Sequence, residues 1–133
     1  MSTQANVQKV QEIYAAFGKG DIKTITSSLA EDVDWQTIGP PVFPHAGPHH
    51  GPKEVEQFFG KIMSTFDVKK FEPREFIAEG DKVVVLGSIG GNIKPTGKSY
   101  EAEWAMVWSF RNGKVVKWRE YIDTAKLAAA LVA

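Results

Sequence analysis

The sequence contains no cysteine, which excludes disulfide bonds, thiolate nucleophiles and cysteine-based zinc sites. It also lacks an excess of either charge, because 16 Lys and Arg residues balance 16 Asp and Glu residues. We therefore expect neither nucleic acid nor a membrane as a partner, since no global field would attract either one. No apolar run approaches membrane-spanning length, and no basic segment precedes an apolar one at the N-terminus. These absences predict a cytoplasmic protein.

Composition is otherwise that of an ordinary globular chain, with 43% hydrophobic and 24% charged residues among 133. This length is enough for a substantial core, and no linker, repeat or low-complexity segment divides it. We expect one domain over residues 1–133.

Three helices are predicted before the main strands. Apolar residues recur at three- and four-residue steps from Thr3 to Phe17, and Asp21 then caps a shorter helix. The clearest helical face follows Pro52, which suits the first turn of a helix. That face comprises Val55, Phe58, Phe59, Ile62, Met63 and Phe66.

The strand predictions cover most of the second half of the chain. A short strand is expected at Asp32–Ile38, followed after the third helix by Phe71–Glu79, Lys82–Ile93 and a long hairpin over Ser99–Asp123. Pro73 indicates an edge strand or a bulge, and the alanine-rich tail is expected to be helical. Helices segregated to one side of an antiparallel sheet make an α+β domain. If the sheet curves around the third helix, the result is a cone whose wide end can hold a ligand.

Residues 39–52 contain five of the seven prolines and all three histidines. Prolines and glycines disfavour regular hydrogen bonding, so we expect no continuous helix or central strand through this segment and a mobile loop at His45–His50. Adjacent histidines in such a loop seldom converge on one ion, and we expect no metal. His50, just before Gly51, is instead the candidate proton shuttle at the cavity mouth.

The register of the Ser99–Asp123 hairpin decides which side chains share a face, because a one-residue slip moves them all to the other side. A three-residue bulged loop at Arg111-Asn112-Gly113 would set Trp104, Met106 and Trp108 across from Glu120, Trp118 and Val116. A two-residue turn would instead place Glu120 beside Ala105 and Val107. We prefer the first register, because it gathers three of the four tryptophans around a single carboxylate.

The opposite face of the predicted sheet carries an apolar stripe among charged residues. A stripe of this kind suggests a second copy of the chain, so we expect a homodimer through the outer sheet face. The outer stripe consists of Val84, Leu86, Ala105, Val107 and Tyr121.

Short motifs along nearly the whole chain resemble the SnoaL-like branch of the NTF2-like (nuclear transport factor 2-like) superfamily, which includes ketosteroid isomerases, polyketide cyclases and limonene-epoxide hydrolases. The resemblance implies a cone in which three N-terminal helices pack on a strongly curved antiparallel sheet. The motifs are Gly20-Asp21-Ile22, Leu29-Ala30-Glu31-Asp32, His50-Gly51, Pro95-Thr96-Gly97-Lys98-Ser99-Tyr100, and Gly113-Lys114 with Trp118-Arg119-Glu120-Tyr121-Ile122-Asp123.

Within this resemblance, Glu120 holds the place of an aspartate in the limonene-epoxide hydrolases, while their companion arginine and aspartate would fall near Gly87 and Ile89. The ketosteroid isomerase base would fall near Thr37, and the second acid of those enzymes near Met106. The catalytic aspartate of the polyketide cyclases could match either Asp123 or Glu120.

The candidate catalytic residues are therefore Glu120, His50 and Asp123. Burial among tryptophans would raise the pKa of Glu120 and suit it to acid–base chemistry; Asp123 can equally cap the tail helix. The expected substrate-binding wall comprises Tyr14, Trp35, Thr37, Phe59, Trp104, Met106 and Trp118.

These residues predict a small enzyme that needs no cofactor and acts as an isomerase, cyclase or hydrolase on an apolar small molecule, with cyclic compounds among the candidates. Two alternatives stay open at this point. One is a non-catalytic protein that binds such a molecule, and the other is a dimeric interaction module of the same fold.

Overall fold

The computed structural model describes residues 2–133. In chain order the elements are α1 (Thr3–Gly18), α2 (Ile22–Ser27), β1 (Leu29–Ile38), β2 (Gly47–His50), α3 (Gly51–Thr65), β3 (Phe66–Glu79), β4 (Lys82–Ile93), β5 (Ser99–Arg111), β6 (Lys114–Ile122) and α4 (Thr124–Leu131).

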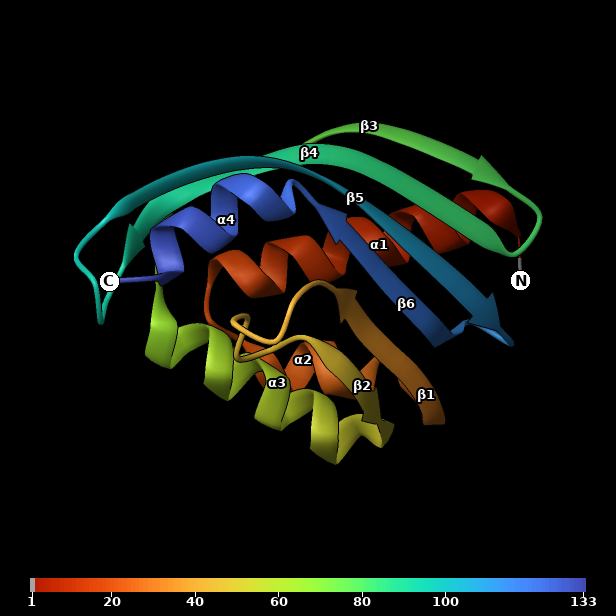
Figure 1. Cartoon of the computed structure of the whole chain (residues 1–133). Coiled ribbons are helices and arrows are strands. Elements are labelled where there is room, and N and C mark those ends of the chain that lie inside the picture. Colours follow the sequence, from red (N-terminus) through yellow and green to blue (C-terminus); the bar gives the residue numbers. More distant parts are fainter. Residues whose placement is uncertain (1) are drawn as a thin grey trace.

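The six strands form one sheet in the order β2-β1-β6-β5-β4-β3. Only β1 and β6 run parallel, while the other neighbours are antiparallel. The sheet arches over the helices, and all four helices lie on its concave side (Figure 1). This arrangement confirms the predicted α+β class. No helix within residues 2–133 combines the length and apolar character needed to cross a membrane.

The helix starts follow from local side-chain chemistry. The Ser2 hydroxyl accepts a hydrogen bond from the Ala5 amide at 3.0 Å, and the Asp21 carboxylate accepts one from the Thr24 amide at 3.1 Å. Each bond satisfies a donor that the first helical turn leaves without a partner. The predicted cap at Asp21 is thus confirmed. Phe66, which the sequence grouped with the third helix, is instead the first residue of β3.

The β5–β6 hairpin places Glu120 on the expected face, but with a different turn and a bulge at a different position. Asn112 and Gly113 both have positive φ, 52° and 78°, as a two-residue type I′ turn requires, so the predicted three-residue loop is wrong. The bulge lies further on, because Phe110 pairs with Val115 and Ser109 with Lys117, which leaves Val116 as an extra residue. Beyond it Met106 pairs with Glu120, and Trp104 pairs with Ile122 rather than with Glu120. The single extra residue returns Glu120 to the tryptophan face.

The proline-rich segment is more ordered than the sequence predicted. Residues Gly47–His50 of this segment form β2, which pairs with β1 through Pro48, His49 and His50. Strand β2 lies at the sheet edge, where Pro48 needs no partner on its outer side. Phe43 and His45, upstream of β2, are buried. The expectation that this segment lacks regular hydrogen bonding was therefore wrong for residues 47–50.

Two glycines of β4 lie opposite irregularities in β3. The register of β3 shifts between Val68 and Lys70 and again between Pro73 and Glu75, opposite Gly91 and Gly87. The bulge and the edge position expected for Pro73 are both confirmed. At Gly91 a β-carbon would collide with the Asp67 carbonyl oxygen and lie 2.9 Å from the Lys69 nitrogen. The close approach of β3 to β4 at this point thus depends on glycine.

Two groups of buried side chains fill the concave side. The larger group joins α1, α2 and α3 to the centre of the sheet and contains three tryptophans of β1, β5 and β6 that contact one another, Trp35, Trp108 and Trp118. The smaller group lies under α4 and joins Leu127 and Ala130 to Phe66 and Tyr100. Helix α4 therefore covers the end of the concave side where β4 meets β5 (Figure 1).

Replacing Gly91 by alanine should lower the free energy of unfolding by about 1–3 kcal/mol, because the added methyl group forces β3 away from β4. Gly60 is the matched control. It is an exposed residue of α3 with open space around it, so Gly60→Ala should stabilise the protein by about 0.5–1 kcal/mol. Urea denaturation of both variants measures the two effects, and equal effects would contradict the close approach at Gly91.

Candidate active site

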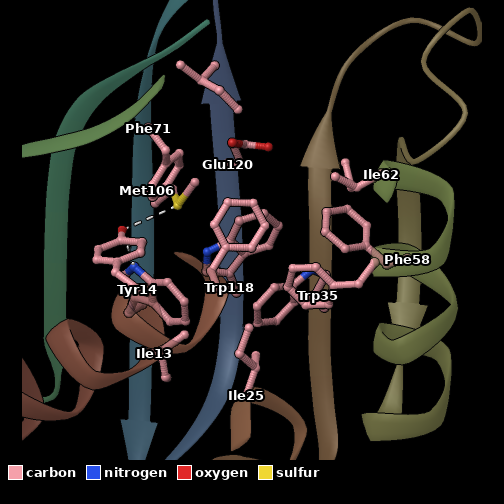
Figure 2. A pocket seen from close by; sticks show the side chains of 14 residues that line it. Ile13, Tyr14, Ile25, Trp35, Phe58, Ile62, Phe71, Met106, Trp118 and Glu120 are labelled. Carbon is pink, nitrogen blue, oxygen red and sulfur yellow. Dashed lines mark hydrogen bonds between the residues drawn. The ribbon is translucent and has the colours of Figure 1, made fainter. Parts of the chain in front are cut away.

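A small cavity of about 70 Å³ lies between α1, α3 and the inner face of the sheet. Its wall is almost entirely apolar and mostly aromatic, and among the described residues that line it Glu120 is the only one with a carboxyl group. Figure 2 shows the Glu120 carboxyl group on β6, one step along the same face from Trp118. A concave aromatic space with a few polar groups is a typical small-molecule site.

Strand pairing on both sides positions Glu120. It pairs with Met106 of β5 and with Thr37 of β1, which lies 83 positions away in the sequence. The Thr37 hydroxyl donates a hydrogen bond to Glu120 Oε1 at 2.9 Å, and the glutamate residue is only 8% exposed. The neighbouring Arg119 points to the opposite face, where its guanidinium binds the Asp34 carboxylate at 2.7 Å. Because side chains alternate between the two faces of the strand, Arg119 does not neutralise the charge of Glu120.

Burial raises the pKa of Glu120 to about 7, because the apolar wall does not solvate the charged form. The hydrogen bond from Thr37 acts in the other direction and lowers that pKa by stabilising the carboxylate, but burial is the larger cause. A carboxyl group with a pKa near neutrality can accept and return a proton at physiological pH.

Tyr14 of α1 brings a second polar group to the cavity. Its hydroxyl accepts a hydrogen bond from the Trp108 indole N–H at 3.1 Å and donates to the Met106 sulfur at 3.3 Å (Figure 2). Burial is the main reason why the pKa of Tyr14 lies far above its ordinary value, and the nearby Glu120 raises it further. The phenol therefore stays protonated. Because a thioether is a weak acceptor, the hydroxyl can exchange this bond for one to a ligand oxygen.

Most of the predicted wall surrounds the cavity. Of the seven expected substrate-binding residues, those that line it are Tyr14, Trp35, Phe59, Met106 and Trp118. Thr37 is fully buried and reaches the site only through its bond to Glu120, so it is a positioning residue. Trp104 lies outside this wall, where it stacks on Phe71 with ring centroids 5.1 Å apart.

The structure does not bring the other two catalytic candidates to the cavity. His50 is exposed at the start of α3, where its backbone N–H donates to Glu54 at 2.8 Å, so the expected place at the cavity mouth is wrong. Asp123 accepts a hydrogen bond from the Lys126 amide at 3.2 Å and caps α4. The capping alternative for Asp123 is thus confirmed, and Glu120 is the one of the three candidates that lines the cavity.

The three histidines do not converge on one point. His45 is buried against Phe43 and Phe66, and burial lowers its pKa to about 4. His49 packs on Phe58, with its Nε2 atom 3.1 Å from the Lys61 ammonium and its Nδ1 atom 3.1 Å from the Gly47 carbonyl oxygen. Burial and the Lys61 charge both lower the pKa of His49. Neutral His45 and His49 are part of the packing beneath β2.

Sequence reasoning missed several residues of the wall. Ile13, Ile25 and Phe71 line the cavity, yet in the sequence they read as ordinary apolar positions of helices and a strand. Only the curvature of the sheet brings Phe71 of the edge strand over α1, where its ring lies 5.5 Å from that of Tyr14. A pattern of alternating residues carries no signal for such a contact.

The model for the SnoaL-like domain matches residues 10–118, so the chain belongs to this family. An NTF2-like protein from Burkholderia xenovorans LB400 is 39% identical over 99% of both chains, with a TM-score of 0.90. An NTF2-like protein from Burkholderia pseudomallei K96243 is 31% identical over the whole of both chains, with a TM-score of 0.88. The predicted NTF2-like cone is thereby confirmed.

A third similar structure is that of TerC co-crystallised with polyporic acid. It is 25% identical over 96% of this chain and 98% of that chain, with a TM-score of 0.85. A comparison with curated proteins gave no match.

The raised pKa of Glu120 predicts a pH-dependent contribution to stability. The group binds its proton more tightly in the folded chain, so its stabilising contribution is complete below pH 4.5 and is lost as the pH rises through about 7. Relative to Glu120→Gln, the wild-type free energy of unfolding should fall by roughly 3 kcal/mol across this window, at about 1.4 kcal/mol per pKa unit. Urea denaturation of both proteins at a series of pH values gives the difference. Parallel pH profiles of the two free energies of unfolding would contradict a raised pKa of Glu120.

Proposed function

We propose that the protein is a small acid–base enzyme of the isomerase or cyclase kind, acting on an apolar small molecule with an enolisable carbonyl group. The observation that carries this proposal is the buried Glu120 carboxyl group with a pKa of about 7 in an aromatic cavity. A base of this strength is half ionised at neutral pH, which favours proton transfer in both directions.

The chemistry needs two groups of this chain. The Glu120 carboxylate removes a proton from a carbon next to the carbonyl group, and the electron pair of that C–H bond moves into an enolate. The Tyr14 hydroxyl donates a hydrogen bond to the enolate oxygen in place of the Met106 sulfur. Return of the proton from Glu120 to a different carbon completes an isomerisation. Alternatively, attack of the enolate carbon on a second carbonyl group closes a ring, and the proton held by Glu120 passes to the alkoxide oxygen that this attack creates.

The cavity wall supports an aromatic or alicyclic ligand. Trp35 and Trp118 stack with ring centroids 4.1 Å apart, and neither indole N–H finds an acceptor among residues 2–133. Both rings line the cavity and make its wall largely aromatic. TerC, which shares the fold, was co-crystallised with polyporic acid, and this favours a cyclic ligand for the present chain as well.

Hydrogen exchange in D₂O tests the proposal without knowledge of the natural substrate. A panel of small cyclic ketones, beginning with cyclohex-3-enone, is incubated with the protein, and loss of the α-proton signals is followed by NMR. Exchange should rise with pH and level off above about 7, because the ionised carboxyl group is the base. Glu120→Gln should slow the exchange by about 10²–10⁴-fold.

Asp123→Asn is the matched control, since it makes the same chemical change at an exposed carboxylate that only caps a helix. Asparagine caps as well as aspartate does, so this variant should exchange the ketones at the wild-type rate. Equal loss in both variants would contradict a specific role for Glu120.

Ligand binding without catalysis is the second candidate function, because Glu120 is the only carboxyl group among the described residues that line the cavity. In that case the ketones quench tryptophan fluorescence, but the wild-type protein leaves their α-protons in place.

We also propose that the protein pairs with a second copy through the outer sheet face. All four helices lie on the concave side, which leaves the convex face without a covering layer (Figure 1). Of the outer stripe, Tyr121 is 50% exposed and Val84, Leu86, Ala105 and Val107 are partly exposed. The stripe is flanked by Glu75, Glu103 and Arg74 in a shallow groove, so both signs of charge are available to a two-fold contact.

Val107→Glu should convert the dimer to a monomer, because two-fold symmetry places the new charges in one apolar contact. Sedimentation equilibrium at micromolar concentration measures the mass. Gln11→Glu, which adds the same charge at an exposed position of α1 on the concave side, is the control and should stay dimeric. A monomeric wild-type protein would contradict the outer-face interface.

A further inference from the structure

A second, open cleft lies beside the inner cavity. It has a volume of about 590 Å³ and is bounded by the end of α1, the end of α3 and the beginning of β3. Phe17, Ile62 and Phe71 line both spaces, so these three side chains form the partition between the cleft and the cavity that holds Glu120. All three residues of the partition are partly exposed.

The inner cavity is too small for a cyclic ligand by itself. Its volume of about 70 Å³ is well below the roughly 300–1,000 Å³ of pockets that bury a drug-sized ligand. A ligand that reaches Glu120 must therefore displace the partition and extend into the outer cleft. The chemistry of the cleft then helps to select the ligand.

All charged side chains among the described residues that line the cleft are positive. Among its described lining residues three are lysines, Lys69, Lys70 and Lys94, and none is acidic. The Lys69 ammonium pairs with Asp67 at 3.1 Å, and that of Lys70 lies 3.8 and 3.9 Å from Glu72 and Glu101. These two charges are partly balanced by carboxylates that do not line the cleft.

Lys94 is held differently. Its ammonium group donates to the Met63 carbonyl oxygen at the end of α3 at 2.6 Å, and no salt bridge within residues 2–133 involves it. One of its three protons is used by that bond, so two donors are available in a fixed place. A charged ammonium group beside an apolar cleft attracts an anion, and it does so more strongly than in bulk water.

We propose that the cleft binds the anionic group of an amphiphilic ligand, a carboxylate or an acidic enol, with Lys94 as the principal contact and Lys69 and Lys70 as secondary ones. The apolar ring of the same ligand passes between Phe17, Ile62 and Phe71 toward Glu120. This inference rests on the proposed function for the identity of the inner site, and it narrows the substrate class to anionic ring compounds.

The test uses two probes of equal shape, naphthalene-2-carboxylate and naphthalene-2-carboxamide, whose binding is measured by isothermal titration calorimetry at low and high salt. The carboxylate should bind roughly ten-fold more tightly at low ionic strength, and the preference should shrink at 0.5 M salt because the lysines are solvent-accessible. Lys94→Gln should weaken carboxylate binding by about five-fold, the upper range for an exposed ion pair, and leave carboxamide binding unchanged.

Two further variants separate a loss of charge from a structural effect. Lys94→Arg keeps the charge and a donor to the Met63 carbonyl oxygen, and it should restore the preference for the carboxylate. Lys53→Gln makes the same change of net charge at the exposed start of α3, and it should leave both affinities as in the wild type. Equal binding of the two probes, binding of neither, or a preference that Lys94→Gln leaves at its wild-type size would overturn the proposal.

The outcome is independent of the chemistry at Glu120. Glu120→Gln should retain the preference for the carboxylate, because the anionic group lies in the outer cleft. If exchange of ketone protons fails while the preference holds, the proposed reaction is wrong and the anion site stands. If the preference fails while exchange holds, the reaction stands and the anion site is wrong.

Discussion

The alternation of side chains along β6 is the constraint on which the site depends. This strand lies between β1 and β5, so its register fixes both neighbours at once. The extra residue at Val116 decides which alternate residues of β6 face inward. It places Trp118 and Glu120 in the core, while Arg119 binds Asp34 on the other face. Without the bulge, the guanidinium would face the aromatic wall and the carboxylate would face solvent.

Burial of a carboxyl group in such a wall is unfavourable unless the group is hydrogen-bonded or neutral. Both conditions hold for Glu120. Thr37 supplies one hydrogen bond across the parallel β1–β6 pair, and the raised pKa of Glu120 lets the group remain protonated up to about neutral pH. The parallel pairing matters for this result, because it brings residues 37 and 120 side by side on one face although the chain between them forms most of the sheet. The site therefore forms only when the sheet is complete.

Much of the fold could be predicted from local patterns. The caps at Asp21 and Asp123, the helical face after Pro52 and the bulge at Pro73 each have a signal within a few residues. The predictions failed where the outcome depends on distant partners. Asn112-Gly113 is compatible with two loop lengths, and only the pairing of β6 with both neighbours explains why a two-residue turn is followed by a bulge at Val116. Similarly, β2 forms because β1 offers a free edge to a proline-rich segment. Glu120 was found because its face was predicted correctly, whereas the positions of His50 and Trp104 depended on packing that the sequence does not encode locally.

The buried imidazole of His45 lies beneath β2, and its protonation opposes that of Glu120. Folding lowers the pKa of His45 from 6.5 to about 4 and raises that of Glu120 from 4.5 to about 7. Between pH 5 and 6, roughly the interval between the two unfolded values, the unfolded chain carries a proton on the imidazole and the folded chain carries one on the carboxyl group. For these two groups, folding in this interval thus transfers a proton from one side chain to the other with little net exchange with the solvent. Their combined contribution to stability then varies little with pH, even though each group titrates, so a flat contribution would conceal two opposite protonation equilibria within one small protein.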